Sequence, residues 1–392
     1  KLRDHAADGL IFLLPKPRAN VGIKPQMWYT DNVGGSAEKH GGHGSRTASD
    51  RPRRTAYRRE SAMSKTQPPE LQKNQAEPAG TGHALGLQGS SGPEGLAPLK
   101  PGRSLGSNTN NADVETLANL GFTRIEVCLG RHRPYHDMLE RIFSDLDAAK
   151  ALGMAYTIHL PLCLYDWFPF DYLDGYYLDP DPSKRALAFR FLEENLRQLA
   201  GRYQPDYYVI HFPGIYRNAY FGLDFQAILH ESLGRLQSIA EGFGVTLALE
   251  YFGANRDFNR PEQWIEALSG YSRLAPLLDT GHLYFSCLMN GFDFDEVLEM
   301  MAPHCVGFHV WTVQGNDYYG NSPFYRQYHH VVPHSGQLRS EGWAFEPGAV
   351  YHRLRAFEAP VVVEATSLYG GSDYYFEGLR YAADCYLGGD CE

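Results

Sequence analysis

The pattern of apolar and polar positions divides the chain near residue 104. Beyond it, short runs of β-forming residues alternate with longer segments whose apolar residues recur every three or four positions, the spacing of one helix face. The predicted strands are 104–110, 124–129, 155–162, 206–213, 245–251, 275–282, 305–313 and 360–366. The predicted helices between them include 136–153, 183–203, 224–244, 260–270 and 346–358.

This alternation predicts an α/β fold. Eight strands, each followed by a helix or a helix-like segment within about 285 residues, are typical of a closed (β/α)8 TIM barrel. A doubly wound open sheet uses the same alternation, so it is the alternative at this point. We therefore expect residues 104–392 to form one barrel domain.

Residues 1–103 show no sustained apolar period and are rich in Gly, Pro, Ser and Arg. Such a composition cannot bury enough surface to offset chain entropy, so we expect this segment to be disordered. Met63 opens a stretch that looks like an ordinary start, and one hypothesis is that residues 1–62 are read-through of upstream sequence. The alternative is a basic tail that binds an anionic partner.

Charge and composition narrow the class of protein. Residues 1–103 carry a net charge of +7 and the remainder −17, which together give −10. A barrel this acidic argues against a nucleic-acid partner, because duplex binding relies on basic groups that neutralise phosphates. No apolar run reaches the roughly 18 residues that span a bilayer. The six cysteines form no C-x-x-C pair, which indicates mostly reduced thiols and a cytoplasmic location.

Polar residues stand repeatedly at the ends of the predicted strands. In a TIM barrel these ends form the mouth where the chemistry occurs. The residues are His159, His211, Glu250, Asp279, His282, His309 and Glu364. Each alone has a structural explanation, but three carboxylates and four imidazoles on one face would repel and desolvate one another unless a cation held them. The pattern therefore predicts a divalent metal site, because both side-chain types bind such ions.

The same residues carry a family resemblance. The runs "IHLP", "IHFPG", "LEYFG", "LLDTGH", "GFHVW" and "VVVEA" resemble, in this order and spacing, the xylose isomerase-like barrels, which include sugar isomerases, epimerases and the apurinic endonuclease family 2. The resemblance covers about residues 104–388. It implies a metal-binding quartet of Glu250, Asp279, His309 and Glu364. It also implies second-metal or substrate-binding roles for His159, His211, His282 and His330.

The resemblance to the endonuclease branch is incomplete. That branch has an Asp-Arg-His triplet after its seventh strand, and here Tyr328 stands where the aspartate would be, two residues before His330. The His-x-Asn-Asp sequence usual after that strand is replaced by "HVWT". A tyrosine is not an ordinary substitute for a carboxylate ligand, so a full three-metal site is not expected.

Three functions follow from this site. The first is a sugar or sugar-phosphate isomerase or epimerase, in which Glu250 and Glu364 transfer a proton next to a carbonyl. The second is a metal-dependent hydrolase of a small phosphodiester, with His159, His211 and His330 completing a second metal site. The third is a catalytically silent binding barrel, which would bind no metal. The ion could be Mn, Mg, Co, Zn or Fe, because mixed carboxylate and imidazole ligands suit them all.

Two long loops are expected to shape the substrate pocket. They run from Cys163 to Pro182 and from Gln314 to Phe345, and their aromatic content suits stacking on sugar rings or covering apolar surface. Trp311, Arg256 and Arg326 are candidate substrate contacts near the strand ends. Further arginines in such positions are Arg131, Arg133, Arg217 and Arg260. Pairing with acids in nearby loops would explain these arginines equally well.

Overall fold

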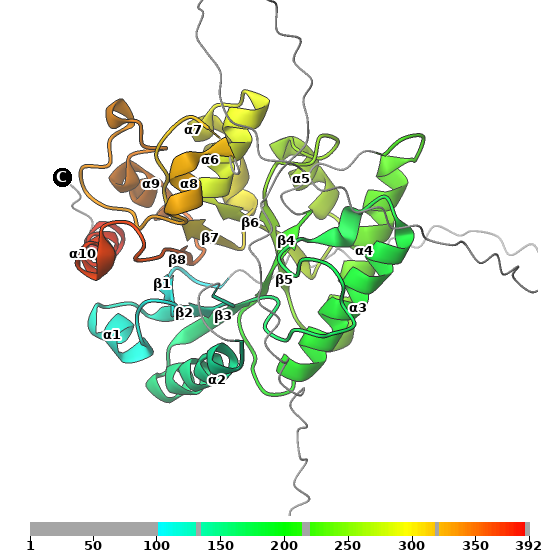
Figure 1. Ribbon diagram of the computed structural model, residues 1–392, viewed down its shortest axis with the longest axis horizontal. Coiled ribbons are helices and arrows are strands. Elements are labelled where there is room, and N and C mark those ends of the chain that lie inside the picture. The colour runs from blue at the N-terminus through cyan, green and yellow to red at the C-terminus, as the bar shows by residue number, and fades with distance from the viewer. Residues whose placement is uncertain (1–100, 131–134, 214–219, 318–320, 389–392) are drawn as a thin grey trace, which may run out of the picture. The chain divides into compact units, whose positions relative to one another are not determined.

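The structure, a computed structural model, describes residues 101–130, 135–213, 220–317 and 321–388 (Figure 1). The N-terminal segment predicted to be disordered lies outside these ranges, apart from its last three residues. Within the described ranges, no helix combines the length and the apolar character needed to cross a membrane.

Eight parallel strands form a closed barrel in chain order, from β1 to β8. The strands are β1 Leu105–Asn108, β2 Arg124–Val127, β3 Ala155–His159, β4 Tyr208–Phe212, β5 Leu247–Tyr251, β6 Leu274–Asp279, β7 Gly307–Val310 and β8 Val361–Val363. Closure is made by β1 and β8, where Gly106 pairs with Val362. The predicted barrel is confirmed, and the open sheet is excluded.

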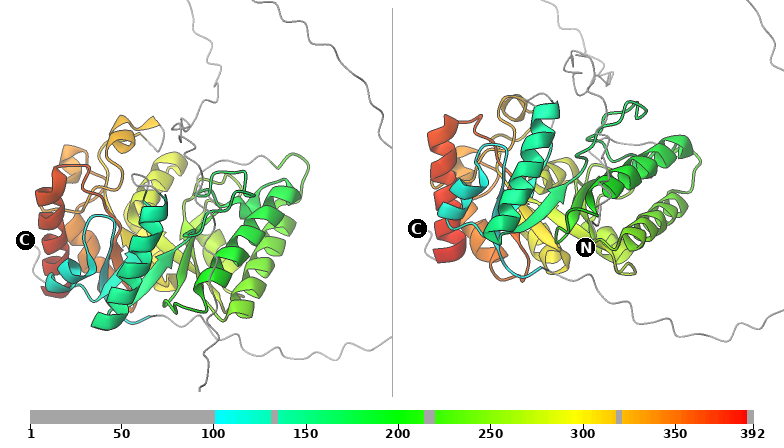
Figure 2. Two further views of the ribbon diagram at one scale, coloured as in Figure 1. Left: turned by 60° about the horizontal axis from the view of Figure 1, so that its bottom comes forward. Right: turned by 90° about the horizontal axis from the view of Figure 1, so that it is seen from below.

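Helices surround the strands on the outside of the barrel, as both views in Figure 2 show. They are α1 Val114–Asn119, α2 Tyr135–Leu152, α3 Pro182–Leu199, α4 Phe225–Phe243, α5 Pro261–Leu268, α6 Thr280–Asn290, α7 Phe294–Met301, α8 Pro323–Gln327, α9 Pro347–Leu354 and α10 Gly371–Ala383. Short 3-10 helices are η1 Tyr176–Leu178, η2 Ala302–His304 and η4 Arg339–Glu341, and a π-helical turn, η5 Asp384–Gly388, follows α10.

Local sequence explains where several helices begin and end. The carboxylates of Asp113, Asp181 and Asp224 accept backbone N–H groups in the first turns of α1, α3 and α4. Gly244 and Gly291 follow α4 and α6 in the left-handed conformation that ends many helices. The five helices predicted from the sequence therefore appear within one or two residues at their starts.

One predicted strand is too long. The sequence placed residues 275–282 in a strand, but β6 ends at Asp279 and α6 begins at the next residue. The reason is the Asp279 side chain, which accepts the backbone N–H of His282 at 2.7 Å and so caps a helix. Gly281 permits the tight start, because a Cβ there would lie 2.3 Å from the Trp311 indole. His282 therefore lies in the first turn of α6.

The strands are buried apolar runs with a few polar exceptions. Their residues are almost all buried, as parallel strands covered by helices require. The buried polar exceptions on the strands include Glu126, Thr157, His159, Glu250, Asp279 and His309. These side chains must find partners inside the barrel, and most belong to the site described below.

The cysteines fit the sequence prediction in part. Cys128, Cys163, Cys287 and Cys305 are free thiols. Cys385 is disulfide-bonded. A disulfide is uncommon in cytoplasmic proteins, so the cytoplasmic location stays a prediction.

Candidate metal centre

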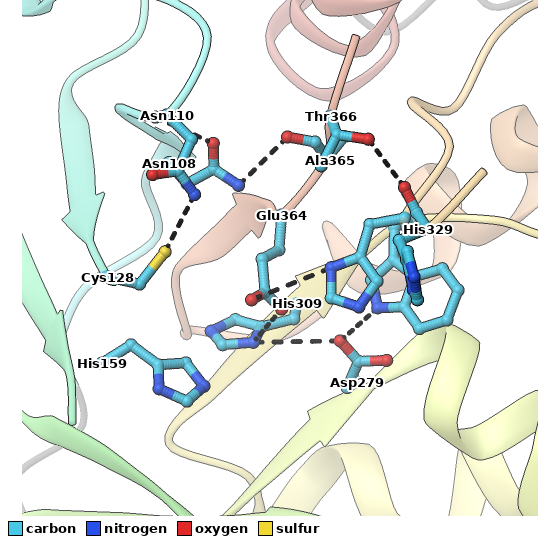
Figure 3. Close-up of polar contacts among 12 residues, drawn as sticks. Asn108, Asn110, Cys128, His159, Asp279, His309, His329, Glu364, Ala365 and Thr366 are labelled. Carbon is cyan, nitrogen blue, oxygen red and sulfur yellow. Dashed lines mark hydrogen bonds and ion pairs between the residues drawn. The ribbon is translucent and has the colours of Figure 1, made fainter. Parts of the chain in front are cut away.

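Four acidic and imidazole side chains converge at the carboxyl ends of neighbouring strands. Glu250 is on β5, Asp279 ends β6, His309 is on β7 and Glu364 directly follows β8. One ligand atom from each lies within 4.8 Å of the others, and all four residues are buried. Figure 3 shows Asp279, His309 and Glu364 pointing toward one another. The four residues that the family resemblance implied as a quartet are therefore close in space.

His309 is the centre of this group. Its Nδ1 lies 3.0 Å from Glu364 Oε2 and 3.8 Å from both Glu250 Oε1 and Asp279 Oδ2. Burial disfavours the charged imidazolium, but the carboxylates of Glu126 and Glu364 outweigh burial and raise the pKa of His309 well above its usual value. The ring therefore lies in a strongly negative field.

Asp279 is held by two hydrogen bonds. Oδ1 accepts the backbone N–H of His282, and Oδ2 accepts Trp311 Nε1–H at 2.7 Å. Burial and the nearby charges of Glu250 and Glu364 raise the pKa of Asp279 well above its usual range. The carboxylate is thus fixed in direction while its charge is disfavoured by its neighbours.

Three histidines surround Glu250. His159 Nε2 and His211 Nε2 lie 3.2 and 3.3 Å from Oε2, and His282 Nε2 lies 3.5 Å from Oε1. Burial disfavours the charged carboxylate, but the imidazoles of His159 and His211 hold the pKa of Glu250 well below its usual range. The hydrogen bond to Glu250 outweighs burial in His159 and raises the pKa of this ring to about 9. Glu250 is therefore ionised at neutral pH.

Two further histidines are kept neutral. Burial lowers the pKa of both His282 and His330 to about 3. His330 stacks on Trp311 with ring centroids 4.2 Å apart, and its Nδ1 lies 3.9 Å from Glu364 Oε1. It adopts a positive φ of 50°, which is uncommon for a residue other than glycine. Both rings offer neutral hydrogen-bonding groups next to the carboxylates.

The cluster fits a divalent cation. Glu250 Oε1, His309 Nδ1 and Glu364 Oε2 are buried and make no hydrogen bond of good geometry. Buried polar atoms without a hydrogen bond are rare, and three that converge on one point indicate a place where a cation can bind. Glu250, Asp279, His309 and Glu364 together offer the mixed oxygen and nitrogen donors that such ions accept. His159, Glu250 and His309 form a second, overlapping group within the same distance limit.

A cavity of about 300 Å³ opens directly beside the cluster. Of the predicted site residues, it is lined by His159, His211, Glu250, His282, His330 and Glu364. Leu173 from the first long loop and Tyr325 from the second also line it. Both loops that the sequence singled out therefore contribute to its wall.

Several other predicted contacts lie elsewhere. Arg256 and Arg326 are exposed and do not line the cavity. Trp311 is fully buried, and its indole N–H is engaged by Asp279. Tyr328 packs against Phe324 and Tyr369 rather than facing the cavity. Arg131, Arg133 and Arg217 lie outside the described residues, and Arg260 directly precedes α5, where its backbone N–H donates to Gln263 Oε1.

Sequence reasoning missed one wall of the cavity and one buried acid. The wall is formed by the last residue of β1, by residues after β1 and β2, and by residues on α2, namely Asn108, Asn110, Cys128, Arg141 and Asp145. Asn110 Nδ2 donates to Cys128 Sγ at 3.1 Å (Figure 3). The buried acid is Glu126 on β2. A charged residue inside the apolar run "RIEVCL" could have indicated it.

The second long loop is attached to the barrel at Val331. The backbone of Val331 pairs with Thr312, which follows β7, and with Thr366, which follows β8. Thr366 also donates its N–H to His330 O at 2.8 Å and its hydroxyl to His329 O at 2.7 Å. These bonds hold His329 and His330 against the cavity.

The fold and site define a TIM barrel with a carboxylate and imidazole cluster at its mouth. Residues 114–383 match the family described as xylose isomerase-like TIM barrel, and the chain belongs to that family. Comparison with curated protein sequences gave no match.

Several solved structures are similar to this chain. An E. coli 3-keto-D-glucoside 4-epimerase in its apo form is 15% identical, with 72% of this chain and 100% of that chain covered and a TM-score of 0.48. A zinc-bound IolI protein is 18% identical, with 73% and 95% covered and a TM-score of 0.46. A magnesium-bound xylose isomerase-like TIM barrel protein from Mycobacterium smegmatis is 10% identical, with 72% and 98% covered and a TM-score of 0.42.

Proposed function

We propose that this protein is a divalent-metal-dependent isomerase or epimerase of a sugar or sugar phosphate. One observation carries the proposal. Glu250 and Glu364 both line the cavity, and both offer a carboxylate oxygen to the same cluster. Inverting a carbon next to a carbonyl needs one group to remove its proton and another to return a proton to the opposite face, and hydrolysis does not strictly require such a pair.

The residues have distinct tasks in this reaction. Glu250 is ionised by its histidine neighbours, which is the state that a base requires. Glu364 lies across the cluster and exchanges the proton on the other side of the substrate carbon. His282 and His330 line the cavity as neutral rings and can bind substrate hydroxyls. A divalent ion held by the quartet would polarise the carbonyl as a Lewis acid.

Solvent deuterium exchange tests the proposal. The metal-loaded protein is incubated in D2O with ketoses, their phosphates and inosose-like polyols. At least one compound should gain deuterium at the carbon next to its carbonyl, and Glu250→Gln and Glu364→Gln should each stop the exchange. Metal content must be measured in both variants, because each side chain is also a proposed ligand. No exchange with any compound by metal-loaded wild type refutes the proposal.

A second function has its own supporting observation. His159 and His211 both approach the same oxygen of Glu250, which suits a second ion bridged to the first. Two adjacent ions are typical of phosphodiester hydrolysis, with one activating water. Metal analysis separates the two functions, because one ion per chain favours the isomerase and two or three favour the hydrolase. Cleavage of a small phosphodiester without any deuterium exchange would decide for the hydrolase.

A further inference from the structure

Glu126 is a charged residue in the middle of a buried strand. It lies on β2 between Ile125 and Val127, is fully buried and does not line the cavity. Burying a carboxylate costs several kcal/mol or more unless partners compensate. An acid in this position therefore needs a reason that packing alone does not give.

Its partners come from β3 and β7. Thr157, its register neighbour on β3, donates its hydroxyl to Glu126 Oε2 at 2.9 Å. The Nε2 of His309, on β7, lies 3.1 Å from the same oxygen. The opposite ring nitrogen of His309, Nδ1, faces Glu250, Asp279 and Glu364. Glu126 thus contacts the imidazole from the side away from the cluster.

We propose that Glu126 is a positioning residue that holds His309 in the Nε2–H tautomer, so that Nδ1 presents its lone pair to the metal. A neutral imidazole has one N–H donor and one acceptor, and a carboxylate can only accept. The Nε2–H bond to Glu126 therefore leaves Nδ1 as the acceptor. Carboxylates that receive the free N–H of a metal-bound histidine fix its orientation and increase its basicity. The inference rests on the metal centre of the proposed function.

A structural role for Glu126 would have a different consequence. If the Glu126–His309 pair only joined β2 to β7, an apolar residue in place of the acid would leave His309 Nε2 buried without a partner and would lower the free energy of unfolding. Metal affinity would then be unchanged. If Glu126 sets the tautomer, the same replacement frees the ring to turn or to carry its proton on Nδ1.

Calorimetric titration of the metal-stripped full chain with Zn²⁺ alone measures this difference. Glu126→Met should weaken binding by about 10–100-fold, the usual cost of losing such an outer partner. Glu126→Gln should stay within a few-fold of wild type, because an amide oxygen in the place of Oε1, which also lies 3.1 Å from His309 Nε2, can still accept Nε2–H while the NH2 faces the Thr157 hydroxyl. Tyr207→Phe is the matched control, since it removes a buried hydroxyl that has no hydrogen-bond partner among the described residues. Wild-type affinity in Glu126→Met overturns the proposal.

Nitrogen NMR of the histidine rings identifies the tautomer directly in the wild-type protein, so the result does not depend on whether a variant folds. In the Zn²⁺-loaded wild type, His309 should carry its proton on Nε2, and a proton on Nδ1 overturns the proposal. If wild type binds no Zn²⁺, the metal centre itself is wrong. The ring of His309 in the metal-free protein at alkaline pH, where it is neutral, still reports whether Glu126 selects the Nε2–H form.

Discussion

Replacing Asp279 by asparagine separates its two tasks, capping α6 and binding a metal. The asparagine Oδ1 can still accept the N–H of His282, but its NH2 then faces Trp311 Nε1–H, and two donors meet. If the amide is turned over, the cap is lost instead. Either way one buried hydrogen bond is broken, which costs about 1–3 kcal/mol. The substitution also removes a buried carboxylate whose pKa is raised by burial and by the charges of Glu250 and Glu364, and this offsets part of the cost.

The free energy by which bound metal stabilises the folded state decides whether Asp279 is a ligand. A metal present at about 100 times its Kd stabilises the folded state by about 2.7 kcal/mol. Loss of one of four protein ligands should raise Kd by at least about 100-fold, which leaves about 0.4 kcal/mol at the same concentration. The difference of about 2.3 kcal/mol corresponds to about 4 °C in Tm for a domain of about 290 residues, because the entropy of unfolding grows with chain length.

Thermal unfolding with Zn²⁺ and with chelator measures this difference. Wild type should show the Tm increase, and Asp279→Asn should lose most of it whatever its metal-free Tm. Asp145→Asn is the matched control, because Asp145 is a cavity-lining carboxylate outside the cluster. An undiminished metal-dependent increase in Asp279→Asn would show that Asp279 is not a ligand.

Three other predictions follow from the sequence and the site. Deletion up to Pro101 should leave the circular dichroism spectrum and the metal content unchanged, and insoluble protein or halved metal would contradict this. Metal affinity should fall as pH falls from about 8 toward about 6, the range in which histidines titrate. The reason is that metal binding releases protons, and the carboxylates around His309 raise the pKa of this ligand. Equal affinity by titration at both ends of the range would refute this prediction. Trp311→Phe should lower the free energy of unfolding by about 1–3 kcal/mol in denaturant titrations, because it leaves an oxygen of Asp279 without its buried donor; a change near zero would count against that bond.

The fold was largely predictable because each strand is a short buried run bounded by turn residues. The strands containing His159, His211 and Glu250 were located to within a few residues. The error at His282 has a clear cause. The predicted strand was extended from the apolar run of β6 to His282, but the Asp279 side chain accepts the N–H three residues later, which ends the strand and begins α6. Periodicity contains no information about such a bond.

The site residues at the ends of strands could be predicted from the sequence. The residues within a strand and those on the opposite wall of the cavity could not. The proposed ligands follow apolar runs, so their position at the mouth could be inferred. Glu126 lies within a strand and acts through the ring of His309, from a strand 183 residues earlier in the sequence. Trp311 was expected to contact substrate, yet its indole turns toward Asp279. Sequence spacing does not say which way a side chain points inside the barrel, and this direction decides whether a side chain reaches the cavity.

The attachment of the second long loop at Val331 divides that loop into two parts with different freedom to change length. Residues before this point supply Tyr325, His329 and His330 to the cavity wall. Residues after it pass through an exposed turn at Ser335 and Gly336, which does not line the cavity. Because backbone bonds to Thr312 and Thr366 lie between the two parts, an insertion at the turn is mechanically insulated from the wall. A fluorophore-binding peptide placed between Ser335 and Gly336 would therefore label the rim of the barrel without reshaping the pocket.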